Sequence, residues 1–238
     1  MVTLIIKIVK SNGTSDDDLY KVTTDQDYRN YIYKTINSSS RHYIDQIFRQ
    51  IDEINRLINQ FNIELTQAYY NSMSDIFKRA NDIENLINQC WYSNQFKKTF
   101  SFYIGLHYAS HLLANAIKAE QRKIRDTFVR QKNRRDHWDK KINSLKEQQQ
   151  KASSSRRALI GKDIADSCRM HQSIAALASQ IGEMNTKYNE RVTYQNNQTG
   201  KRRDFIAEHF GEKGERWKDR MHERAIFSNS GNEGREVS

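Results

Sequence analysis

The clearest chemical feature of the sequence is a run of cationic side chains between Gln121 and Arg157. This stretch holds 13 Lys or Arg residues against 4 Asp or Glu residues, a surplus of +9, while the whole chain carries +10. Cations spread along an extended segment can neutralise successive phosphates and release condensed counterions. We therefore expect nucleic acid as the partner. An acidic protein, an anionic lipid surface and simple solvation of the charges are the alternatives.

The residues expected to contact phosphates lie along a helix predicted from about residue 99 to 150 and in the linker that follows it. They are Arg122, Lys123, Arg125, Arg130, Lys132, Arg134, Arg135, Lys140, Lys141, Arg156 and Arg157. We expect these side chains to grip the phosphate backbone, most simply of DNA, without reading base sequence. Trp138 and the arginines could also stack on the bases of a single strand.

Two pairs of residues have spacings that occur in metal sites. His107 and His111 lie four apart, and Cys168 and His171 lie three apart, so each pair shares one face of a predicted helix. If the two helices pack together, the four side chains could form a tetrahedral site. However, no Glu follows His107 as it does in the HExxH motif of zinc proteases, and such residues on a helical seam commonly serve packing. We expect no metal or other cofactor and keep these four as weak candidates only.

The sequence contains none of the common catalytic motifs. With only 9 glycines in 238 residues, it has no glycine-rich phosphate loop, no nucleophile elbow and none of the kinase motifs. His137 alone within a basic helix is not evidence for a general base. We therefore expect a protein that is not an enzyme, with a metal-dependent hydrolase as the least favoured alternative.

The composition predicts a mainly α-helical protein. The chain has no proline, 37% hydrophobic residues and a mean hydropathy of −0.91, which favours long helices with narrow apolar seams and few connections. Its two cysteines cannot form a disulfide framework, so we expect reduced thiols and a cytoplasmic protein. The uncharged run at residues 99–117 could just span a bilayer. Because it contains several polar residues, we predict a buried helix and no membrane span.

One predicted helix carries three heptads of apolar residues at alternating steps of three and four. They are Ile44, Ile47, Ile51, Ile54, Ile58, Phe61 and Leu65. This spacing is typical of a coiled coil, so we expect these residues to form an oligomer interface or to pack against a helical partner protein. The pattern then slips by four residues and resumes from Tyr69 to Cys90, and we predict that the helix continues through the slip.

These patterns divide the chain into five parts. Residues 1–24 are expected to form a strand or hairpin. A long-helix hairpin or bundle with a basic end follows at 25–150. A third helix at 151–200 comes after a Ser/Gln-rich linker and closes in the run from Asn196 to Gly200. The remaining parts are a short helical tail at 201–227 and a disordered end at 228–238.

The favoured function is a non-enzymatic, self-associating accessory or assembly protein that binds nucleic acid through a basic helix. The main alternative is a coiled-coil adaptor or structural component of a protein complex, such as secretion or envelope-associated machinery. In that case the basic segment would face an acidic partner protein.

Overall fold

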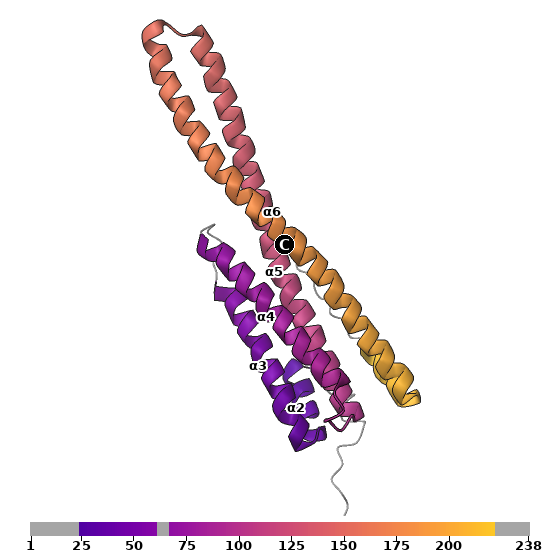
Figure 1. Cartoon of the computed structure of the whole chain (residues 1–238). Helices are drawn as coiled ribbons and strands as arrows, with labels where there is room; N and C mark the ends of the chain where they lie inside the picture. The colour runs from indigo at the N-terminus through magenta and orange to yellow at the C-terminus, as the bar shows by residue number, and fades with distance from the viewer. Residues whose placement is uncertain (1–23, 61–66, 222–238) are drawn as a thin grey trace, which may run out of the picture. The chain divides into compact units, whose positions relative to one another are not determined.

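The computed structural model describes residues 24–60 and 67–221, and helices make up most of this part of the chain (Figure 1). Five helices have defined bounds, and residues 212–221 are also helical. The five are α2 (Asp25–Thr35), α3 (Ser38–Gln60), α4 (Gln67–Tyr92), α5 (Phe100–Lys151) and α6 (Ser154–Phe210). No strand occurs within these described ranges, so the mainly α fold class is confirmed. The predicted N-terminal strand or hairpin and the predicted disordered end lie outside the described residues.

The start of α2 shows how local sequence sets a helix end. Thr24 precedes the helix in an extended conformation, and its Oγ1 accepts a hydrogen bond of 3.1 Å from the backbone N–H of Asp27. The Asp27 carboxylate in turn accepts a hydrogen bond of 3.3 Å from the backbone N–H of Thr24. This capping box satisfies two N–H groups that the first turn leaves without helical partners.

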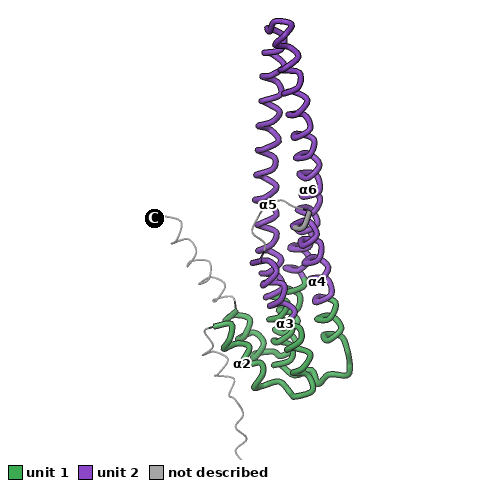
Figure 2. Tube along the Cα trace, turned by 90° about the vertical axis from the view of Figure 1, so that its left-hand side faces the viewer, with its two compact units in different colours: residues 1–49, 85–111, 198–238 green, residues 50–84, 112–197 purple. Residues whose placement is uncertain are grey.

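The chain forms two compact units. The described residues of the first unit are 24–49, 85–111 and 198–221 (Figure 2, green). Residues 102–110 of α5 are buried there along their whole length. A Cβ added at Gly105 would lie 3.1 Å from Cγ2 of Ile32, so the glycine lets α2 approach α5 closely. The buried Trp217 donates a hydrogen bond of 3.1 Å from its indole nitrogen to the hydroxyl of Tyr28.

The described residues of the second unit are 50–60, 67–84 and 112–197 (Figure 2, purple). In this unit, two hydrogen bonds join side chains of α6 to α4. The hydroxyl of Tyr188 donates to the carbonyl of Met73 at 2.8 Å, and Gln195 Nε2 donates to the Glu84 carboxylate at 2.7 Å. Because the residue numbers of the bonded partners rise together on the two helices, α4 and α6 run in the same direction. Further along α5 and α6, these two helices continue alone as an antiparallel hairpin (Figures 1 and 2).

Two predicted helix ends were wrong. We predicted one helix from Ile44 to Cys90, but α3 ends at Gln60 and α4 begins at Gln67, and the two lie side by side (Figures 1 and 2). The third helix was expected to end at residues 196–200, but α6 continues to Phe210.

Tertiary hydrogen bonds explain why the polar run at 196–200 stays helical. The Oγ1 of Thr199 lies 2.8 Å from the Oγ of Ser110, and the guanidinium of Arg202 donates to Ser110 at 2.6 Å and to Asn88 at 2.8 Å. These contacts stabilise a helix that local propensity disfavours. Gly211, with φ of 54°, follows its last residue and provides a left-handed C-terminal stop.

The expected oligomer seam is buried inside the single chain. Its described members have exposed fractions of 4% or less; they are Ile44, Ile47, Ile51, Ile54 and Ile58. Phe61 and Leu65 lie outside the described residues. The heptad spacing therefore reflects packing of α3 within its own chain, and these five side chains present no surface to a second copy. None of the described helices combines the length and apolarity needed to cross a membrane.

Candidate nucleic-acid interface

The basic residues lie on the antiparallel hairpin of the second unit. We call this element the basic hairpin: α5 from Gln121 to Lys151 together with α6 from Ser154 to Asn189. Gln121 Nε2 donates to Oδ1 of Asn189 at 2.7 Å, and His171 Nε2 lies 3.0 Å from Oδ1 of Asp139. Near the turn, Gln149 Nε2 donates to the carbonyl of Arg157 at 3.2 Å. The two helices thus stay side by side from Gln121 to the turn.

A thin apolar seam holds the hairpin together and keeps the cations outside it. Ile124 and Ile142 of α5 and Ile160, Ile174 and Ile181 of α6 are buried. At Gly182 an added Cβ would lie 3.2 Å from the ring of Phe128, which indicates close approach of the helices there. Since the seam occupies one side of α5, cationic side chains cover the remainder of its circumference.

The structure brings all eleven expected phosphate-contacting residues onto this hairpin. Nine are exposed: Arg122, Arg125, Arg130, Lys132, Arg134, Lys140, Lys141, Arg156 and Arg157. Lys123 and Arg135 are partly buried. From Arg122 to Lys141, nine cations lie within about 29 Å of helix at a rise of about 1.5 Å per residue. Duplex DNA presents about 17 phosphate charges over that length, so these cations could neutralise about half of them.

Several of these cations also make contacts within the chain. The Lys123 ammonium donates to the carbonyl of Ile58, and Arg157 Nε donates to the carbonyl of Ala152 at 3.0 Å beside the turn. Arg130 donates to Oγ1 of Thr127 at 3.1 Å. The contacts of Lys123 and Arg157 could not be predicted from the sequence, because their acceptors are backbone carbonyls. The Arg130 contact lies within α5, three residues apart.

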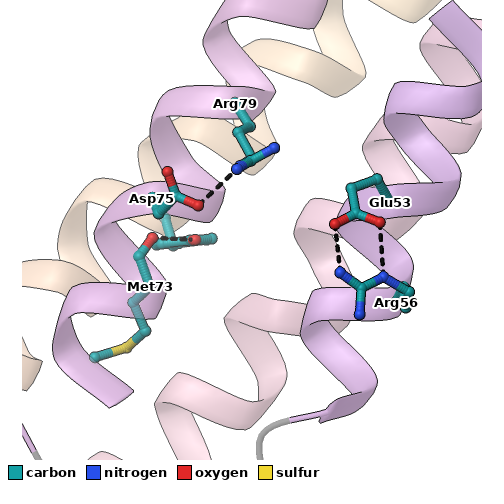
Figure 3. Close-up of polar contacts among 6 residues, drawn as sticks. Glu53, Arg56, Met73, Asp75 and Arg79 are labelled. Carbon is teal, nitrogen blue, oxygen red and sulfur yellow. Dashed lines mark hydrogen bonds and ion pairs between the residues drawn. The ribbon is translucent and has the colours of Figure 1, made fainter. Parts of the chain in front are cut away.

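Within the described residues, five of the eleven form no ion pair, side-chain hydrogen bond or cation–π contact: Arg122, Lys132, Arg134, Lys140 and Arg156. Three cations on α3 and α4 do form ion pairs, namely Arg49, Arg56 and Arg79. Figure 3 shows Arg56 bonded to Glu53 through two contacts of 2.7 and 2.5 Å, and Arg79 bonded to Asp75 at 2.8 Å. Such pairs neutralise charge locally. The basic hairpin has too few carboxylates to do the same.

The cations of α5 face in several directions. Lys123, Arg130, Arg134 and Lys141 follow the spacing i, i+7, i+11, i+18 and share one face. Lys132 follows Arg125 by seven residues on another face, and Arg122 and Lys140, eighteen apart, share a third. A phosphate strand could therefore approach α5 from more than one side. This arrangement suits binding to a charged backbone more than reading of one groove.

Base stacking on Trp138 has less support. The indole is only partly exposed, and the Lys141 ammonium lies 4.5 Å from the centre of its ring. The Lys141 side chain therefore competes with a base for one face of this ring. The cations therefore remain the main candidates for contact, through phosphates.

The structure gives the four weak metal candidates no support. His107 and His111 lie in the first unit, whereas Cys168 and His171 lie in the second. Among residues 24–60 and 67–221, no group of three or more His, Cys, Asp or Glu side chains is placed to hold a metal ion. Burial lowers the pKa of His107 to about 3, and its ring packs edge-on against Trp217 at 4.9 Å. The described residues therefore give no support to the Cys-His₃ arrangement kept as a weak candidate, and His107 is a packing residue.

The sequence reasoning missed a buried carboxyl group in the second unit. Glu120 is 2% exposed, and burial raises its pKa to about 7, although the nearby Lys123 opposes this rise. A signal was available, because Glu120 follows Ile117 by three residues and precedes Ile124 by four. That spacing places the carboxyl group on the apolar face of α5.

No family model, curated protein or solved structure matches this chain.

Proposed function

We propose that the protein binds nucleic acid through the phosphate backbone, without sequence preference, using the exposed cations of the basic hairpin. The observation that carries this proposal is the set of five cations that have no partner among the described residues, on an element with few carboxylates. A surplus of this kind is unfavourable in isolation because like charges repel. It becomes favourable when a polyanion supplies the countercharges.

The rigidity of the support strengthens this proposal. Both helices of the hairpin are continuous from Gln121 to the turn and from the turn to Asn189. The cations therefore sit at fixed spacings along a continuous helix, and binding need not order a flexible segment. Conformational entropy then opposes binding less than it would for a disordered basic tail.

Three cations without partners provide the sharpest test. The triple variant Arg122→Gln, Lys132→Gln, Lys140→Gln removes three positive charges from α5 while leaving the seam intact. Each phosphate contact contributes about 0.9 to the slope of log K against log salt concentration, so the slope should become shallower by about 2 to 3. Fluorescence anisotropy with a labelled duplex of arbitrary sequence measures this slope.

A matched control removes three positive charges elsewhere. The variant Arg49→Gln, Arg56→Gln, Arg79→Gln changes the net charge equally but affects cations that are paired with Asp45, Glu53 and Asp75. It should leave the slope nearly unchanged. If both triple variants weaken binding equally, net charge and not the hairpin governs binding. No binding at about 50 mM salt would contradict the proposal directly.

A further inference from the structure

The cations of the basic hairpin project from two opposite sides of α5. Arg134 follows Arg125 by nine residues, and Lys141 follows Lys132 by the same number. Nine residues make about two and a half helical turns, so the two members of each pair point in opposite directions. Residues seven apart share a side, which places Arg134 with Lys141 and Arg125 with Lys132.

Each side carries a third cation at helical spacing. Arg130 precedes Lys141 by eleven residues, and Lys146 follows Lys132 by fourteen. We call one set the first cationic face (Arg130, Arg134 and Lys141) and the other the second cationic face (Arg125, Lys132 and Lys146). All six side chains are exposed.

The side of α5 that points away from α6 separates the two faces. Arg122 and Lys140 each precede a buried isoleucine of the seam by two residues, which places them on the far side of the helix. Three pairs of opposite charge follow one another there at the spacing i, i+4: Arg122 with Asp126, Asp136 with Lys140, and Glu147 with Lys151. Their formal charges cancel, so a neutral strip lies between the two cationic faces.

Carboxylates of α6 border the first cationic face near the turn. Asp163 and Asp166 line a surface hollow together with Trp138 and Lys141. Asp166 is paired with Arg169, whereas Asp163 forms no ion pair with any described residue. The three cations of this face therefore exceed the unpaired carboxylates beside them.

The second cationic face keeps a similar surplus. Arg125 lies 3.5 Å from Asp126, but both side chains are solvated, so this pair contributes little. Asp139 belongs to the same side of α5, and its carboxylate lies 3.0 Å from Nε2 of His171. The two lysines of this face form no ion pair with any described residue.

Both faces are accessible along most of their length. The hydroxyl of Tyr188 bonds to Met73, so Gln67, the first residue of α4, is level with Gly182 of α6. Gly182 in turn lies against Phe128 of α5. Among the described residues, α5 and α6 continue alone beyond this level (Figures 1 and 2). Five of the six cations lie beyond it, which leaves them open to a partner on either side.

We propose that the basic hairpin bridges two nucleic-acid duplexes, one on each cationic face, with α5 between them. This inference rests on the proposed function. A stiff duplex that lies against one face cannot also reach cations that project from the opposite side of α5. Phosphate charges on two duplexes repel each other, and cations placed between the duplexes offset this repulsion.

The neutral strip argues against a single duplex that contacts both faces. A helix in the major groove has a phosphate strand on each flank, and α5 would have to enter with the side opposite α6. That side carries Asp126, Asp136 and Glu147. These carboxylates would then lie between two phosphate strands, where like charges repel. Two duplexes on the flanks of α5 avoid this repulsion.

The number of duplexes bound per chain tests the bridge. Duplexes of about 12 base pairs, or about 40 Å, suit the test because the first and second cationic faces span only about 17 Å and about 32 Å. Sedimentation equilibrium at about 50 mM salt, with a dye-labelled duplex in excess, gives the ratio of duplex to the 28.2 kDa chain. The wild-type protein should saturate at two duplexes per chain.

Removing the cations of one face at a time identifies the two sites. The first-face variant is Arg130→Gln, Arg134→Gln, Lys141→Gln. The second-face variant is Arg125→Gln, Lys132→Gln, Lys146→Gln. Each variant should retain one duplex per chain and bind the second at least about tenfold more weakly, because three phosphate contacts are lost.

A matched control is Arg49→Gln, Arg56→Gln, Arg79→Gln, which removes the same charge outside the hairpin and should still bind two duplexes. Far-UV circular dichroism checks that every variant keeps its helices. Saturation of the wild type at one duplex per chain would overturn the bridge but leave the proposed function intact. Two duplexes per chain in both face variants would also overturn it. No binding at all would overturn the proposed function and the bridge together.

Discussion

Glu120 offers a quantitative test of the packing in the second unit. This carboxyl group is 2% exposed and its pKa in the folded protein is about 7, against 4.5 for the ordinary group. The folded state therefore binds the proton more tightly than the unfolded state does. The stabilising contribution is complete below pH 4.5 and is lost as the pH rises towards 7. Each unit between the two pKa values corresponds to about 1.4 kcal/mol, so the full loss is about 3 kcal/mol.

The Glu120→Gln variant isolates this effect, because glutamine resembles the protonated side chain and cannot ionise. Urea denaturation at several pH values gives the free energy of unfolding of both proteins. We expect nearly equal values at pH 4.5 and a variant that is more stable by up to about 3 kcal/mol at pH 7.5. The comparison of the two proteins at each pH removes contributions from all other titrating groups.

The comparison must also cancel the contribution of His107 to the pH dependence of stability. Its pKa is lowered to about 3 by burial, so its contribution is complete above pH 6.5 and is lost as the pH falls towards 3. The slopes from His107 and Glu120 therefore oppose each other between pH 4.5 and 6.5. The variant Glu190→Gln, which changes an exposed carboxylate on α6, is the matched control. A stability difference between Glu120→Gln and the wild type that does not change with pH would refute the reasoning.

Two further predictions concern single positions. Gly200→Ala should stabilise the protein by about 0.5–1 kcal/mol in thermal denaturation, because the position is inside α6 and an added Cβ meets nothing within 4 Å. Gly214→Ala should destabilise it by about 1–3 kcal/mol, because the Cβ would lie 2.4 Å from the carbonyl oxygen of Ile206; equal effects of the two substitutions would contradict this packing. Cys90 should resist alkylation at pH 8 until the protein unfolds, since burial raises its pKa to about 11; rapid labelling in the native state would contradict its burial.

Sequence periodicity predicted the helices well where packing is apolar. The long helix expected from about 99 to 150 is α5, from Phe100 to Lys151, and the isoleucines from Ile44 to Ile58 are buried as their spacing indicates. The predictions failed where tertiary contacts override local signals. The run from Asn196 to Gly200 reads as a helix end, but the bonds of Thr199 to Ser110 keep α6 continuous.

The candidate interface was only partly predictable. The charge surplus between Gln121 and Arg157 is evident from the sequence, and so is its position on a helix. Which cations lack partners is a property of the assembled fold. Lys123 bonds to a carbonyl of α3, whereas Arg134 has no partner among the described residues. That Asp163 and Met170 line the same hollow as Trp138 also depends on the register of two helices, which periodicity alone does not give.

The most direct test of the central claim is the salt dependence of duplex binding by the wild-type protein. The nine cations from Arg122 to Lys141 set an upper limit of about −8 on the slope of log K against log salt concentration. Since at least Arg122, Lys132 and Lys140 are expected to contact phosphates, we predict a slope steeper than about −3 that is the same for unrelated sequences. A slope near zero, or no binding at low salt, would contradict the account.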